Sequence, residues 1–174
     1  MSRTIPTINT ARLTLRAMRP DDFDRYAEIW ADHGVVRYIT GTPMTRPEAW
    51  SSFLRNAGYW HMTGLGQWGI ESHKAPGLIG QAGFFQSMRE HGPDFDAHPE
   101  AGWVLAPEAH GFGYGWEAVA AAHDWFDRVI TGPLVAQIVP DNDPSMRLAH
   151  RLGYVPMRRA GDVTLMIRKS PPLD

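Results

Sequence analysis

The part of the sequence best suited to chemistry is a run of alternating glycines. Gly111, Gly113 and Gly115 follow a strand-like segment that turns at Pro107, and they lead directly into a helix-like segment. Because glycine has no Cβ, the backbone here can curl so that successive N–H groups and a helix N-terminus face one anion. The spacing therefore predicts a loop that binds a phosphate group such as a pyrophosphate. The alternative is that the glycines only permit a tight turn and close helix packing.

Other glycine-rich phosphate loops fit this run less well. The dinucleotide-binding fingerprint needs a glycine where Trp116 stands, and its strand should open the domain instead of following the midpoint. The Walker loop needs a Gly-Lys-Ser or Gly-Lys-Thr ending, which the sequence lacks. A kinase loop needs lysine and aspartate partners that are missing. A nucleotide-binding oxidoreductase is therefore a remote alternative.

Composition excludes several further chemistries. The 174 residues include no cysteine, which rules out a thiol nucleophile, a cysteine-bound metal and a disulfide framework. The eight histidines show no ligand spacing, so no metal is expected. A net charge of −2 and a pI near 6.4 argue against nucleic-acid binding. Residues 1–10 lack a secretion signal, and no apolar stretch approaches the roughly 20 residues of a membrane span. We therefore expect a cytoplasmic protein without membrane contact.

The length and composition of the chain predict a single domain over residues 1–174, with its core at 11–168 and flexible ends. Alternating polar and apolar residues between turn signals predict strands, and apolar residues three and four apart predict helices. The expected strands are 12–16, 67–71, 78–85, 100–105, 134–139, 154–159 and 163–168. The expected helices are 22–33, 47–63, 113–128 and 145–152. Hairpins combined with a strand–helix–strand crossover imply a mixed sheet covered by helices on both faces.

The same pattern assigns side chains to the core or to the surface. The helix at 47–63 is expected to bury Trp50, Phe53, Leu54 and Ala57. The helix at 113–128 is expected to turn Val119, Ala122 and Phe126 inward and His123, Asp124 and Asp127 outward. The polar segment 89–99 is expected to be a surface loop.

Two segments together resemble a known family. The run His110-Gly111-Phe112-Gly113-Tyr114-Gly115 follows a pattern of Arg or Gln, two residues, Gly, one residue, and Gly or Ala. Residues 139–154 contain a strand end, Asn142 with Ser145 three residues later, a short helix, and a Gly-aromatic ending. Both segments resemble the GCN5-related N-acetyltransferases (GNAT superfamily), in particular the branch of ribosomal-protein alanine N-acetyltransferases. The resemblance extends over residues 13–168. His110 departs from it, because the family usually has Arg or Gln there.

The resemblance implies a fold of the mixed α/β (α+β) class. In this GNAT fold a central, twisted, mostly antiparallel sheet of about seven strands is flanked by about four helices. Two parallel strands, expected here at residues 100–105 and 134–139, splay apart and form the cofactor cleft.

The resemblance also implies acetyl-CoA as the cosubstrate, with no metal, and assigns residues to it. The pantetheine arm would pair with the backbone of Val104, Leu105 and Ala106 as an added strand. Asn142 and Ser145 would face the thioester, and Arg151 or Arg147 would meet a phosphate. The pyrophosphate loop comprises His110, Gly111, Phe112, Gly113, Tyr114, Gly115 and Trp116, whose backbone donors would carry the binding.

Acetyl transfer to an amine needs a base that removes a proton from the amine, and an acid or hydrogen bond for the departing thiolate. Glu100 is the leading candidate for the base, because related enzymes often carry a strand glutamate facing the acceptor, and His98 is the runner-up. Ser145 is the leading candidate for the donor to the thiolate, although it could instead cap the short helix. Tyr154 is a second candidate acid, but its position favours packing. No acetyl-enzyme is expected, because there is no cysteine and no Ser–His–Asp motif.

The acceptor is less well determined. Aromatic residues expected near its pocket are Trp30, Tyr38, Trp60, Trp68, Phe84, Phe85 and Trp103. Glu90, Asp94 and Asp96 would suit a cationic amine if the segment 89–99 borders that pocket. The leading hypothesis is an acetyl-CoA-dependent N-acetyltransferase acting by direct attack of a primary amine, from a protein N-terminus or a small molecule. The alternative is an inactive acyl-CoA-binding sensor or interaction module. Many relatives are dimers, so the resemblance also allows a homodimer.

Overall fold

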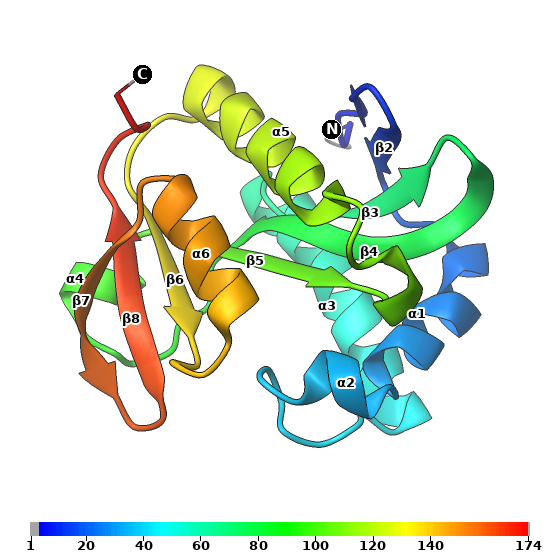
Figure 1. The fold of residues 1–174 in the computed structure, drawn as a ribbon, viewed down its shortest axis with the longest axis horizontal. Helices are drawn as coiled ribbons and strands as arrows, with labels where there is room; N and C mark the ends of the chain where they lie inside the picture. Colours follow the sequence, from blue (N-terminus) through cyan, green and yellow to red (C-terminus); the bar gives the residue numbers. More distant parts are fainter. Residues whose placement is uncertain (1–3, 174) are drawn as a thin grey trace.

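The computed structural model describes residues 4–173 and contains one eight-stranded sheet with helices on both faces (Figure 1). The strands described are β1 (Ile8–Asn9), β2 (Leu13–Arg16), β3 (Gln67–Ser72), β4 (Ala75–Phe85), β5 (Glu100–Leu105), β6 (Leu134–Ile138), β7 (Val155–Ala160) and β8 (Val163–Arg168). The α-helices described are α1 (Phe23–Trp30), α2 (His33–Val36), α3 (Arg46–Thr63), α4 (Pro93–Asp96), α5 (Tyr114–Val129) and α6 (Asp143–Arg151). Pro20–Asp22 and Pro107–Ala109 form short 3-10 turns.

The predicted fold class is confirmed, with three short additional elements. β1 has two residues, too few to produce an alternating pattern. The sequence predicts a first helix that continues to residues 33–34, whereas α1 ends at Trp30 and α2 follows as a separate turn. The Asp32 carboxylate caps α2 by accepting a 3.0 Å hydrogen bond from the Val35 backbone N–H. The third addition, α4, lies in the expected surface loop 89–99, where Phe95 is fully buried.

The strand order of the sheet is β1-β2-β3-β4-β5-β6-β8-β7, and one neighbouring pair differs from the others. Every pair of neighbours is antiparallel except β5 and β6, which are parallel. Parallel neighbours need a crossover connection, and α5 supplies it here. Because β5 and β6 run in the same direction, the segments that follow them, the glycine loop after β5 and the start of α6 after β6, lie at the same end of the sheet.

Each sheet face has its own core. On one face, Trp68, Ala82 and Phe84 pack against α5 residues such as Ala118 and Phe126. On the other face, Leu78, Val104 and Ala106 pack against α1, α2 and the first half of α3. Figure 1 shows α5 in front of the sheet and α3 behind it. The prediction of helices on both faces is therefore confirmed.

The buried stripe of α3 differs from the predicted one. Ala49, Phe53, Asn56 and Trp60 are buried, whereas Trp50 and Leu54 are 44% and 48% exposed and Ala57 is exposed. Thr45 and Glu48 form a capping box that fixes the start of the helix. The predicted stripe and the observed one both match the helical period and share Phe53, so the period alone did not decide between two neighbouring faces of the helix. Trp50 instead packs edge-on against Phe23, with ring centroids 4.8 Å apart.

His123 on α5 is buried, contrary to the prediction that it faces outward. Its ring Nδ1 donates to the Val119 carbonyl, and its Nε2 accepts from the Tyr154 hydroxyl, both at 2.8 Å. Burial disfavours the charged imidazolium and lowers the pKa of His123 to about 4. Burial likewise raises the pKa of Tyr154, so both groups stay neutral at pH 7. The pair ties α5 to the segment after α6.

Asp127, also expected to point outward, anchors the last strand to α5. Arg168 at the end of β8 is only 2% exposed, and its two terminal nitrogens donate to the Asp127 carboxylate at 2.8 and 2.7 Å. Its Nε donates to the Leu152 carbonyl at 2.7 Å. A charge buried this deeply is stable only with such a complete set of partners. Asp124, in contrast, is exposed as predicted.

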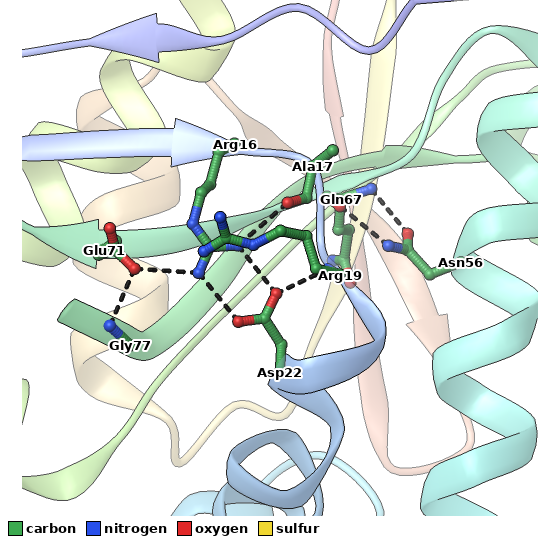
Figure 2. A network of polar contacts seen from close by, with 8 residues as sticks. All are labelled: Arg16, Ala17, Arg19, Asp22, Asn56, Gln67, Glu71 and Gly77. Carbon is green, nitrogen blue, oxygen red and sulfur yellow. Dashed lines mark hydrogen bonds and ion pairs between the residues drawn. The ribbon is translucent and has the colours of Figure 1, made fainter.

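Polar networks position α1 and α3 on the sheet (Figure 2). Arg16 on β2 donates to both oxygens of Asp22 at 2.8 and 2.9 Å and to Glu71 at 3.0 Å. Burial raises the pKa of Asp22, but the bonds from Arg16 and the Arg19 N–H outweigh it, so the pKa lies below its usual value. Asn56 on α3 and the Gln67 backbone exchange two hydrogen bonds, at 2.9 and 2.8 Å. These contacts hold α1 and α3 in place against the sheet.

Among the described residues, we find no helix with both the length and the apolar character needed to cross a membrane.

The buried His123 predicts a pH-dependent stability. Between pH 6.5 and about 4 the unfolded chain binds a proton at this imidazole that the native chain does not, so stability falls as pH falls through this window. The difference between the pKa of His123 in the unfolded chain and in the native chain corresponds to a loss of about 3 kcal/mol in the free energy of unfolding over this pH range. We expect chemical denaturation at pH 7 and pH 4.5 to show most of this loss in the wild type.

His123→Gln is expected to be less stable at pH 7 and to lose much less stability on acidification. His61→Gln, a change at an exposed histidine, serves as the control and is expected to follow the wild type. Equal acid sensitivity in wild type and His123→Gln would contradict the assignment.

Candidate functional site

The main feature of the site is a split in the sheet between β5 and β6. The two strands share one register pair, Glu100 with Val135, supported by a 3.0 Å bond from the Val135 N–H to the Pro99 carbonyl. Beyond this pair they diverge, and α6 lies beside the opening (Figure 1). A cleft of about 850 Å³ extends along the split. The expected splayed strands are therefore present at the expected residues.

The edge of β5 that faces the split offers free backbone groups at alternate residues. The Ala106 N–H donates to Ile79 on β4 at 2.8 Å, so Ala106, and by alternation Val104, direct their backbone groups to β4. Trp103 and Leu105 therefore face the split. Of the three residues predicted to pair with an added chain, only Leu105 offers its backbone there, and its carbonyl accepts a 3.1 Å bond from His110 Nε2. Sequence reasoning missed Trp103 in this role because the alternation is set by the partner strand.

The glycine loop presents a row of unused donors. In residues 4–173, none of the backbone N–H groups from Gly111 to Trp116 has a hydrogen-bond acceptor. Gly111 and Gly113 have φ values of +83° and +78°, which only glycine adopts readily. Gly113 is also the N-cap of α5, so the first turn of this 16-residue helix adds its dipole to the row. Six free donors at a helix N-terminus fit a phosphate or pyrophosphate.

An arginine that the sequence did not single out holds the loop in place. Arg12, at the start of β2, donates to the Phe112 carbonyl at 2.8 Å and to the Glu117 carboxylate at 2.7 Å. Glu117 also accepts from the Arg12 N–H and from Thr10. These residues lie about 100 positions apart in the chain, so no local pattern could reveal the contact. The arginine immobilises the loop carbonyl while the N–H groups stay free.

Ser145 and Asn142 lie at the split, as predicted. The Asn142 side chain caps α6 by accepting from the Ser145 N–H at 3.4 Å. The hydroxyl oxygen of Ser145 accepts a 3.2 Å bond from the Trp103 indole N–H, which joins α6 to β5 across the opening. Asn142, and not Ser145, is therefore the helix cap. The serine hydroxyl hydrogen has no acceptor among the described residues and is available to a ligand.

Glu100 lines the cleft at the point where β5 and β6 meet, and its side chain is 4% exposed. Arg89 donates to both of its oxygens, from Nε at 2.8 Å and from Nη2 at 3.0 Å. A carboxylate has about four lone-pair positions, so two remain for a substrate or a water. Sequence reasoning missed Arg89, because it lies in an irregular segment where no periodicity predicts direction.

The remaining predicted site residues divide into those that line the cleft and those that do not. Val104, His110, Tyr114 and Gly115 line it. Phe112 is 56% exposed, and Arg151 stacks 3.5 Å over the Trp116 ring on the outside of the loop. The predicted site residues whose side chains do not contribute to the cleft wall are Phe112, Trp116, Arg151, Ala106, Arg147 and His98. Tyr154 is fully buried against His123, as its predicted packing role requires.

The aromatic residues predicted for an acceptor pocket divide in the same way. Trp30, Tyr38, Phe85 and Trp103 line the cleft, whereas Trp60, Trp68 and Phe84 belong to the core. Two side chains of α3 that the sequence did not indicate, Arg55 and Tyr59, complete this wall. Glu90, Asp94 and Asp96 do not line it, and Asp94 pairs with Arg158 on β7. The expectation that acidic residues of segment 89–99 border the pocket is therefore wrong.

Among the described residues, no group of three or more histidine, aspartate or glutamate side chains is placed to hold a metal ion.

Comparisons with known proteins agree with this geometry. A curated relative, the uncharacterized N-acetyltransferase p20 of Bacillus licheniformis, is 28% identical over 150 residues, covering 85% of this chain and 82% of the relative. A putative GNAT-family acetyltransferase from Bordetella pertussis is 30% identical, with a TM-score of 0.82 over 94% of this chain and 99% of that one. An acetyltransferase from Agrobacterium tumefaciens is also 30% identical, with a TM-score of 0.79 over 98% of both chains.

The family description "Acetyltransferase (GNAT) domain" matches residues 12–155, from the arginine that holds the glycine loop to the first residue of β7. The match includes the split strands, the loop and α6. The chain therefore belongs to the GNAT acetyltransferase family and is an acetyltransferase.

Proposed function

We propose that the protein transfers the acetyl group of acetyl-CoA to a primary amine, carried by a protein N-terminus or a small molecule. The observation that carries this proposal is the row of free N–H groups from Gly111 to Trp116, placed at the end of the split between β5 and β6. A cosubstrate with a pyrophosphate and an extended, amide-containing arm fits a phosphate cradle that continues into an unpaired strand edge.

Distinct parts of the cleft suit distinct parts of this cosubstrate. The pyrophosphate would rest on the loop donors, and the arm would pair with the free backbone groups of Trp103 and Leu105. The thioester end would then lie near Asn142 and Ser145. When bound, acetyl-CoA supplies a thioester whose carbonyl carbon bonds to the amine nitrogen as the carbon–sulfur bond breaks and a thiolate leaves.

We assign Glu100 to the proton transfer from the amine and Ser145 to the hydrogen bond that the departing thiolate needs. Glu100 would accept the proton of the amine, directly or through a water, on a lone pair that Arg89 does not occupy. Arg89 would keep the carboxylate in one orientation. Ser145 would donate a hydrogen bond from its hydroxyl to the departing thiolate, which then takes its proton from water, and the bond from the Trp103 indole to the serine oxygen would orient the hydroxyl. Neither role requires a covalent acetyl-enzyme.

A second candidate is an acyl-CoA-binding module without transfer activity. The observation in its favour is the contact between His110 and the Leu105 carbonyl, which engages a backbone group that the arm would use. If the protein is an enzyme, the pantetheine arm of acetyl-CoA must displace the His110 ring or bond to the second lone pair of the Leu105 carbonyl.

Calorimetric titration with acetyl-CoA, followed by a thiol-release assay against a panel of amines, tests the proposal. We expect binding together with amine-dependent release of free CoA above the rate of hydrolysis in buffer. Binding without release for any amine would favour the sensor, and absence of binding would contradict both candidates.

Gly113→Val is expected to weaken acetyl-CoA binding. The residue has φ +78°, and the atom nearest to an added Cβ, Arg12 Nη2, is 3.4 Å away, so the damage comes from backbone strain in the loop. Strain of this kind costs about 1–3 kcal/mol, which corresponds to about 5- to 150-fold in Kd if it falls on the bound form.

Gly132→Val is the matched control, because Gly132 also has positive φ and open space around its Cβ position but lies outside the cleft. The control is expected to lose stability and keep its acetyl-CoA affinity. If Gly113→Val binds acetyl-CoA as well as the control does, the phosphate loop has been misplaced.

Glu100→Gln is expected to lower kcat at neutral pH by about 10²-fold or more, the usual contribution of a general base, with little change in acetyl-CoA affinity. Glu90→Gln, an exposed glutamate outside the cleft, is the control and is expected to match the wild type. Because Arg89 loses its partner in Glu100→Gln, melting temperatures must accompany the kinetics. An unchanged rate in a folded variant would remove Glu100 from the mechanism.

A further inference from the structure

The acceptor part of the cleft has an excess of positive charge. Among the described lining residues, the side chains with a permanent charge at pH 7 are Arg55, Arg89 and Glu100. Both oxygens of Glu100 accept from Arg89, so these two charges neutralise each other locally. The remaining charge is the guanidinium of Arg55. A cleft of this composition disfavours a polycationic acceptor, because no carboxylate is left to pair with a second cation.

The exposed Arg55 side chain makes one hydrogen bond to the described part of the chain and leaves most of its donors free. It lies on the cleft side of α3, and its Nη2 donates to the Ser52 hydroxyl at 3.3 Å. Ser52 also accepts from the Tyr26 hydroxyl on α1 at 2.9 Å. In residues 4–173, eight arginines have a carboxylate within 4.0 Å and six, including Arg55, do not. Among these six described arginines, Arg55 is the one that lines the cleft. A guanidinium has five N–H donors in a planar fork that matches a carboxylate.

An aromatic wall connects Arg55 to the candidate base. Tyr59 follows Arg55 by one helical turn, so both side chains lie on the same face of α3. The Tyr59 ring stacks on Phe85 with centroids 5.7 Å apart. Phe85 on β4 is the register partner of Glu100 on β5. The wall therefore runs from a free guanidinium, past two stacked rings, to the carboxylate proposed to accept the amine proton.

We propose that the acceptor is a primary amine that also carries a carboxylate at the far end of the molecule, of the short-peptide class. Arg55 binds the carboxylate, the Tyr59–Phe85 stack packs against the apolar portion, and the amine is directed to the end of the cleft that holds Glu100. The inference rests on the proposed function and narrows its substrate. Arg55 is a specificity-determining residue that does not touch the reacting atoms.

The test compares acceptors that differ only at the carboxylate. Alanyl-phenylalanine and alanyl-phenylalaninamide form a suitable pair, because a peptide bond separates the amine from the altered group. Spermidine serves as the polycationic acceptor. With acetyl-CoA and the wild type, thiol release should show a kcat/KM for the acid about 10- to 100-fold above that for the amide, the usual effect of a charge-assisted hydrogen bond.

Arg55→Gln is expected to remove this preference mainly by raising KM for the acid, while kcat and the kinetics of the amide change little. Arg55→Lys should restore part of the preference, because it keeps the charge without the fork. Arg128→Gln is the matched control, since Arg128 is an exposed arginine near the end of α5 and outside the cleft. It is expected to behave as the wild type.

The outcomes separate this inference from the proposed function. If acetyl-CoA binds and the amide or spermidine is acetylated at least as well as the acid, the carboxylate class is wrong while the transferase stands. A preference for the acid that survives in Arg55→Gln would overturn the assignment of Arg55. Failure of acetyl-CoA to bind would contradict the proposed function itself.

Discussion

Strands β5 and β6 pair at Glu100 and Val135 and then separate, which leaves two strand edges facing each other without hydrogen bonds inside an otherwise continuous sheet. Unpaired backbone groups in a folded interior are costly, so the split persists only because each strand is held firmly on its other side. β5 pairs with β4 over six residues and β6 with β8 over five. The α5 crossover and the Trp103–Ser145 bond set how the two halves lie relative to each other. The unpaired backbone groups therefore cost stability, and they also form a strand edge that can hydrogen-bond to an extended ligand.

The polar groups of the cleft follow from this arrangement. The loop that leaves β5 must turn back into α5, and its glycines let the turn direct donors outward instead of consuming them. Arg12, which Glu117 holds in place, donates to the Phe112 carbonyl of the loop, and the free N–H groups of the loop carry a local positive potential in a protein whose net charge is −2. At the other end, the Arg16 and Asn56 networks fix α1 and α3, which carry Tyr26, Arg55 and Tyr59 to the acceptor wall. Backbone N–H groups supply the positive potential at the glycine-loop end of the cleft, and guanidinium groups supply it at the acceptor end.

Local patterns predicted much of this structure. The period of apolar residues located the main strands and helices, and the glycine spacing located the loop, because backbone conformation depends strongly on short-range sterics. Errors arose where side-chain direction depended on distant partners. His123 was assigned to solvent because imidazole is polar, yet Tyr154 provides a partner for its ring nitrogen. The polar composition of segment 89–99 predicts a surface loop, but Phe95 packs on the sheet face formed by β6 and β8, against Val135 and Leu165.

The sequence by itself determined the class of fold and the glycine loop, which depend on residue type and short spacing. The resemblance to a known family added the expectation that Glu100, Asn142 and Ser145 lie near one cleft. Only the tertiary structure decided which edge of β5 is free, that Arg89 holds Glu100, that Arg12 pairs with Glu117, and that Arg55 has no carboxylate partner among residues 4–173. The two pairs join residues that are 11 positions apart for Arg89 and Glu100 and 105 for Arg12 and Glu117. The net charge of a cleft is set by side chains from several elements of the fold, so no short segment of the sequence predicts it.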